Sequence, residues 1–130
     1  MDRTGLSHRD EPGLPAPASP FCHVVLDDRY AFFSGRVAAD LEGAAGTLGD
    51  IAAETDLVLR SIRDSLADLR LGMDRIVRVE VHMVDLDEMP AMDAVYRGFF
   101  TDGRYPARTC VEVARLYGGC RVEITCTARL

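Results

Sequence analysis

The sequence predicts a single α+β domain in which two helices cover one face of a β-sheet. A chain of 130 residues is the length of one domain. Five segments show the polar and apolar alternation of strands, and two segments between them show helical spacing, in the order ββαβαββ. The composition, with 48% hydrophobic and 28% charged residues, is that of an ordinary globular protein.

The chain begins with a segment that predicts no regular structure. Residues 1–19 are rich in Pro, Gly and charge and lack apolar periodicity, so we expect a flexible tail ahead of a domain over 20–130. Two β-like runs follow, Cys22–Leu26 and Tyr30–Val37. The Asp27-Asp28 pair between them is a turn signal and indicates a hairpin.

A long helix is predicted after a glycine-rich loop. Asp50 has the residue type of an N-cap, and Gly72 is the residue that we expect just after the C-cap. Between them, residues at helical spacing predict the buried face: Ile51, Thr55, Val58, Ile62, Leu66 and Leu69.

The segment Arg75–Val84 alternates strictly, which predicts a strand with one buried face. Its apolar side holds Val77, Val79, Val81 and Met83, and its polar side holds Arg78, Glu80 and His82.

A second helix is predicted over about Glu88–Asp102, and two final strands over about Ala107–Leu116 and Cys120–Ala128. With both helices on one side, the other face of the sheet stays uncovered. On the last strand, the residues expected on that open face are Arg121, Glu123, Thr125 and Thr127. Their mixed polar and small character suits either solvent or a partner subunit.

Composition disfavours several classes of function. The net charge of −6 and the pI near 5.0 disfavour a nucleic-acid partner. The sequence has no lysine, so it has neither a Schiff-base lysine nor a phosphate-loop lysine. The three histidines are scattered, and we expect no metal site. The acidic run 85–88 is interpreted as carboxylates at a helix N-terminus rather than as a metal cluster.

The expected compartment follows from what the chain lacks. No apolar run approaches the roughly 20 residues of a membrane span, and the N-terminus has no secretory apolar region. The four cysteines show no C-x-x-C spacing. We therefore expect a cytoplasmic protein with reduced thiols and no membrane partner.

Five segments carry a resemblance to a known family. They are FFSGRV at 32–37, the long helix from Asp50, DLDEMPAMDAVYRGFF at 85–100, YPARTCVEVARL at 105–116 and CRVEITCTA at 120–128. Together they resemble the reactive intermediate deaminase (Rid) family, also called the YjgF/YER057c/UK114 family, over about residues 20–129.

The resemblance implies a fold, an assembly and an activity. The fold would be chorismate-mutase-like, and three chains would form a homotrimer whose open sheet faces make a central barrel. Three active sites would lie in clefts between subunits. The activity would be hydrolysis of enamines and imines such as 2-aminoacrylate and 2-iminopropionate, releasing ammonia, without a cofactor.

Three residues have expected roles in that chemistry. Arg108 would clamp the substrate carboxylate, a task that suits a planar, permanently charged guanidinium, and the alternative is an exposed surface arginine. Glu123 matches the glutamate that positions or activates the hydrolytic water, and the alternative is a solvated strand residue. Cys110 matches a cysteine that lines the cleft, or it is a buried thiol without a role.

Three further residues complete the expected substrate-binding set. The hydroxyl of Ser34 and the backbone at Gly35 would contact the ligand, although Gly35 is also a candidate for a β-bulge. Phe21 stands where many members of the resembled family have a tyrosine. This change does not affect the expected arginine and glutamate, but the identity of the substrate is not determined.

Other departures concern Arg36 and Glu54, which stand where glutamine is common, and Asp93, which stands where asparagine is common. Arg36 and Glu54 have opposite charges and are a candidate pair. Three hypotheses remain: an imine deaminase, a non-catalytic trimer that binds small carboxylates such as 2-oxo acids, and an endoribonuclease. The net charge of −6 disfavours the last of these.

Overall fold

Seven strands form one mixed sheet in the computed structural model, which describes residues 3–130. They are β1 (Ser7–Arg9), β2 (Val24–Leu26), β3 (Tyr30–Phe33), β4 (Arg36–Val37), β5 (Ile76–Met83), β6 (Ala107–Glu112) and β7 (Val122–Arg129). The spatial order is β1-β2-β3-β7-β5-β6, and β4 also pairs with β7. Only the β5–β6 pair is parallel among these pairings.

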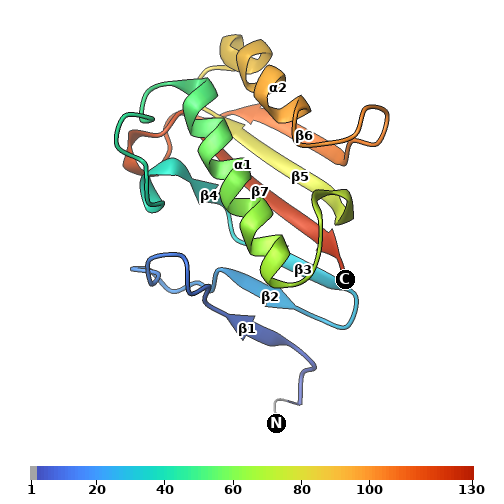
Figure 1. Ribbon diagram of the computed structural model, residues 1–130. Coiled ribbons are helices and arrows are strands. Elements are labelled where there is room, and N and C mark those ends of the chain that lie inside the picture. The colour runs from blue at the N-terminus through green and yellow to red at the C-terminus, as the bar shows by residue number, and fades with distance from the viewer. Residues whose placement is uncertain (1–2) are drawn as a thin grey trace.

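Both α-helices, α1 (Ile51–Asp68) and α2 (Met89–Arg97), lie on the same face of this sheet (Figure 1). Four short 3₁₀ segments connect the elements: Ala38–Asp40, Met73–Arg75, Leu86–Glu88 and Tyr117–Gly119. The core lies between helices and sheet, because the buried apolar residues come from the helices and from one side of each central strand. The predicted α+β fold class is confirmed.

The N-terminus of α1 is as predicted. The side chain of Asp50 accepts a hydrogen bond from the N–H of Ala53, so it is the N-cap. The stripe predicted to pack does so: Ile51, Thr55, Val58, Ile62 and Leu66 are buried, and Leu69 is partly buried.

The C-terminus of α1 differs from the prediction, and the expectation that Gly72 follows the C-cap is wrong. The helix ends at Asp68, and Arg70 takes the left-handed conformation, with φ of 60°. The N–H of Leu71 then donates to the carbonyl of Leu66, as in a Schellman motif. An arginine therefore occupies the position where glycine is the usual residue.

The strict alternation predicted for β5 is interrupted near the start of the strand. The pairing with β7 is shifted between Ile76 and Arg78, so Val77 is the extra residue of an irregularity. Val77 is 43% exposed, whereas Val79, Val81 and Met83 are at most 1% exposed. The prediction that Val77 belongs to the buried face is wrong.

The predicted strand at 30–37 is interrupted in the middle. Between the pairings of Phe32 and Arg36, the register against β7 shifts by one residue. Ser34 and Gly35 form this interruption, which has the one-residue register shift of a β-bulge.

Residues 7–19 form an N-terminal arm, whose strand β1 the sequence does not predict. β1 pairs antiparallel with β2. Glu11 then forms an ion pair with Arg36 at 3.2 Å, and the two side chains are 10% and 5% exposed. Arg36 also donates hydrogen bonds to the hydroxyls of Ser61 and Ser65 on α1. A buried ion pair therefore fastens the arm to β4 and α1.

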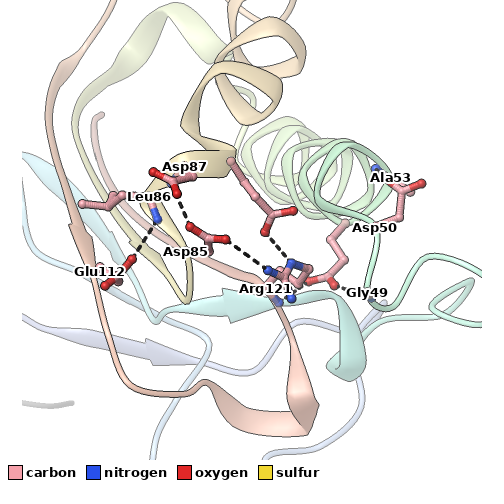
Figure 2. Close-up of polar contacts among 10 residues, drawn as sticks. Gly49, Asp50, Ala53, Asp85, Leu86, Asp87, Glu112 and Arg121 are labelled. Carbon is pink, nitrogen blue, oxygen red and sulfur yellow. Dashed lines mark hydrogen bonds and ion pairs between the residues drawn. The ribbon is translucent and has the colours of Figure 1, made fainter.

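The suggested pairing of Arg36 with Glu54 is wrong. Glu54 is fully buried and accepts hydrogen bonds from the backbone N–H groups of Gly49 and Arg121, each at 2.8 Å. Figure 2 labels Gly49 and Arg121, the two residues whose backbone groups donate to Glu54. Glu54 therefore ties the loop before α1 to the start of β7.

Arg121 lies just before β7, and the expectation that it joins the open face is wrong. Its side chain forms ion pairs with Asp85, at 4.0 Å, and with Glu88, at the start of α2 (Figure 2). Asp85 also accepts a hydrogen bond from the N–H of Asp87. In the described chain, no group of three or more His, Cys, Asp or Glu side chains is placed to hold a metal ion.

Candidate active site

A pocket of about 550 Å³ opens beside the bulge between β3 and β4. Four of the predicted site residues line it: Phe21, Ser34, Gly35 and Glu123. Residues 14–19 of the N-terminal arm form another part of its wall. The arm therefore forms part of the pocket, although all the site residues predicted from the sequence lie in the domain over 20–130.

Glu123 and the bulge are in tight contact. A β-carbon added at Gly35 would lie 2.8 Å from Cδ and 2.9 Å from Oε1 of Glu123. A side chain at residue 35 would therefore require the Glu123 carboxylate to shift from this position. The hydroxyl of Ser34 donates to the carbonyl of Cys22 at 2.6 Å, so its proton is already engaged.

Arg108 lies elsewhere, on β6 and toward α2. Its Nη1 donates to Oδ1 of Asp93 at 2.6 Å, and its guanidinium lies 4.9 Å from the ring centroid of Tyr96. Burial alone would lower the pKa of Arg108, but the hydrogen bond to Asp93 and the surrounding groups outweigh burial and raise this pKa. Arg108 is therefore partly buried and paired with Asp93.

Cys110 lies two residues beyond Arg108 on the same side of β6. Its sulfur is 3.6 Å from the sulfur of Met83, and burial raises the pKa of the thiol, an effect that the Arg108 charge partly offsets. The thiol form is thus favoured at neutral pH, which agrees with a residue that lines a wall rather than one that attacks a substrate.

The predicted site is divided between two faces of the sheet. Arg108 is in register with Val79, whose side chain is buried under the helices. Glu123 is in register with His82 and lies between the buried Val122 and Ile124, so it points to the open face. One chain therefore brings Phe21, Ser34, Gly35 and Glu123 together and holds Arg108 and Cys110 apart from them.

Two further residues near these groups were not predicted as site residues. His82 Nδ1 lies 4.0 Å from Oε1 of Glu123 and is buried without a hydrogen-bond partner in the described chain. The hydroxyl of Tyr96, beside Arg108, also lacks a partner there, and burial raises the pKa of Tyr96 to about 12. The alternation of β5 predicts that His82 lies on the open face. Its neighbour Glu123 is known only from the register between β5 and β7.

Comparisons with known proteins identify the family of this chain. The family model for endoribonuclease L-PSP matches residues 13–130. The chain belongs to this family. A RutC family protein of Synechocystis is 31% identical over 118 residues, which cover 89% of this chain and 90% of that protein.

Two other relatives connect this family to the resemblance drawn from the motifs. The human 2-iminobutanoate/2-iminopropanoate deaminase is 26% identical over 114 residues, covering 88% of this chain and 82% of that protein. The structure of the conserved Rid family protein YyfA from Yersinia pestis has a TM-score of 0.87 at 23% identity, covering 96% of this chain and 99% of that one. The resemblance to the Rid family is confirmed, and the family includes an imine deaminase. None of the helices in the described part of the chain is both long and apolar enough to span a bilayer.

Proposed function

We propose that the protein hydrolyses enamines and imines of the 2-iminopropionate type to 2-oxo acids and ammonia, in active sites shared between the chains of a homotrimer. The observation that carries this proposal is the divided site: the two residues that match the family's machinery, Arg108 and Glu123, lie on opposite faces of one chain. A neighbouring chain that covers the open face would supply the missing half.

The open face has features that support a covering chain. Phe32 and Val111, which are in register with Thr127 and His82 on this face, are 44% and 40% exposed. Large apolar side chains on an uncovered sheet face favour association. The same face carries Glu123, so the association would also enclose the pocket carboxylate.

The chemistry assigns one task to each half. Arg108 has two guanidinium nitrogens, Nε and Nη2, that donate no hydrogen bond to a residue of the described chain, and these would bind the substrate carboxylate. Glu123 would take a proton from water as the water oxygen bonds to the C=N carbon and the π electron pair moves to nitrogen. The protonated Glu123 would return this proton to nitrogen, which gives the carbinolamine. A second proton would move from the carbinolamine hydroxyl to nitrogen, with Glu123 as the relay. The C–N bond would then break, its electron pair would leave with ammonia, and the C–O bond would become the carbonyl of the 2-oxo acid.

The test is hydrolysis of a freshly generated imine. An amino-acid oxidase acting on alanine produces 2-iminopropionate, and semicarbazide traps the imine that is not yet hydrolysed. We expect the protein to suppress trapping in proportion to its concentration. Arg108→Ala should lower this activity by about two orders of magnitude, because a charge-assisted contact of about 3 kcal/mol is lost.

Circular dichroism of Arg108→Ala checks that the fold is retained. Wild-type activity in Arg108→Ala would contradict the proposed site. An inactive wild type that binds pyruvate in calorimetry would contradict deamination and support the non-catalytic carboxylate binder instead.

A further inference from the structure

Asp93 is the charged partner of Arg108. Its Oδ1 accepts the hydrogen bond from Nη1 at 2.6 Å, and the two side chains are 30% and 23% exposed. At this separation and degree of burial, the two charges compensate each other more than an exposed pair would. The guanidinium therefore does not present an uncompensated positive charge.

No other group around Arg108 in the described chain compensates its positive charge as Asp93 does. The Tyr96 ring and the Cys110 thiol are the other groups that influence the guanidinium. Both are neutral at pH 7, since their ordinary pKa values of 10.0 and 9.0 lie above 7 and burial raises each further. Within residues 3–130, Asp93 is the only carboxylate in an ion pair with Arg108.

We infer that Asp93 is a specificity-determining residue, which lowers the preference of the site for imines that carry a carboxylate. The inference rests on the proposed function, in which Arg108 binds that carboxylate. A substrate carboxylate on Nε and Nη2 would share one guanidinium with Asp93, and the two negative charges would repel each other. An imine without a carboxylate would meet no such repulsion.

The charge of this pair strengthens the conclusion. Arg108 and Asp93 together carry no net charge, so the pair attracts an anionic imine less than an unpaired arginine would. Asp93 therefore acts on the substrate's charge rather than on the bond that breaks. Its removal should change KM for carboxylate substrates and leave kcat nearly unchanged.

The experiment compares two imines that differ only in the carboxylate. Alanine and an amino-acid oxidase give 2-iminopropionate, and ethylamine and an amine oxidase give the imine of acetaldehyde. For Asp93→Asn, which keeps the hydrogen-bond acceptor and removes the charge, we expect KM for 2-iminopropionate to fall about tenfold. KM for the carboxylate-free imine should stay the same.

The matched control is Asp87→Asn, which removes the same charge from an exposed residue near the start of α2. It should change neither KM. If Asp93→Asn leaves the ratio of the two KM values unchanged while Arg108→Ala abolishes turnover, the inference is wrong and the proposed function stands. An Asp93→Ala variant with a raised KM beside an unchanged Asp93→Asn would show that Asp93 only orients the guanidinium, and this result would also overturn the inference.

A binding measurement separates the inference from catalysis. Calorimetry with pyruvate, a carboxylate that needs no turnover, should give about tenfold tighter binding to Asp93→Asn than to wild type. If neither imine is hydrolysed but this difference is found, deamination fails and the role of Asp93 stands. Equal affinity of both proteins for pyruvate would overturn it.

Discussion

The carboxylate of Glu123 lies against the backbone of Gly35, so close that a β-carbon at residue 35 would be 2.8 Å from Glu123 Cδ. The contact joins the bulge between β3 and β4 to the strand β7 that carries the proposed base. The position of this carboxylate thus depends on the absence of a side chain at residue 35.

We therefore expect Gly35→Ala to displace Glu123 and lower imine hydrolysis at least tenfold, which corresponds to about 1.4 kcal/mol of lost transition-state stabilisation. Gly13→Ala is the control, because a β-carbon at Gly13 would meet nothing within 4 Å. The measurement is kcat/KM for 2-iminopropionate, with thermal unfolding as the check on the fold. Full activity in Gly35→Ala would show that Glu123 does not need this position.

The division of the site predicts complementation between inactive chains. Arg108→Ala and Glu123→Gln should each be inactive alone, because each removes one half of every site. When the two are unfolded together and refolded as a mixture, some sites receive Arg108 from one chain and Glu123 from another. We expect activity to reappear, and light scattering should give a trimer. A mixture as inactive as its components would place both residues in the same chain's site.

The anchor of the N-terminal arm predicts an effect on stability. Arg36→Ala leaves Glu11 buried without its cation, so the free energy of unfolding should fall by about 3–5 kcal/mol. The control is Arg60→Ala, whose partner Asp56 is about half exposed, and its cost should stay below about 1 kcal/mol. Urea denaturation measures both. Similar small costs for the two variants would mean that the arm is only loosely held.

Alkaline pH should destabilise the protein through Cys126. Burial raises the pKa of this thiol to about 12, above its ordinary value of 9.0, so the folded state holds the proton more tightly than the unfolded state. The stabilisation from this residue is complete below pH 9 and is lost as the pH rises from 9 toward 12. Urea midpoints measured across this range should fall more steeply for wild type than for Cys126→Ala. Parallel curves would contradict the assignment.

Phe21 predicts a shift in selectivity. It lines the pocket with an apolar ring, 45% exposed, at a position where a tyrosine would add a hydroxyl. One neutral hydrogen bond is worth about 0.5–1.5 kcal/mol, so Phe21→Tyr should change the ratio of rates for leucine-derived and alanine-derived imines by about threefold to tenfold, toward the smaller imine. Phe99→Tyr, just after α2 and outside the pocket, should leave the ratio unchanged. The same ratio in both variants would mean that Phe21 does not reach the ligand.

The sequence predicts what depends on local periodicity. The stripe of α1, its N-cap Asp50 and the order of the elements follow from spacing along the chain. The predicted orientations of Val77 and Arg121 are wrong. A register shift decides the orientation of Val77, and carboxylates distant in the sequence decide that of Arg121. Neither leaves a signal in the alternation of residues.

The candidate site shows the same limit. The motifs identify Arg108 and Glu123, but the partners Asp93 and His82 depend on a helix position and on strand pairing that a motif does not contain. The partner of Arg36 lies 25 residues earlier, in an arm without apolar periodicity. Contacts of this kind are settled by packing rather than by composition.

Under the proposed shared site, the opposite orientation of Arg108 and Glu123 would make catalysis depend on protein concentration. If each site needs two chains, dilution below the dissociation constant of the assembly removes active sites without unfolding any chain. Specific activity would then decline as the enzyme is diluted in the assay. A ligand that contacts Arg108 of one chain and Glu123 of another would slow this decline. The substrate would then stabilise the assembly that hydrolyses it.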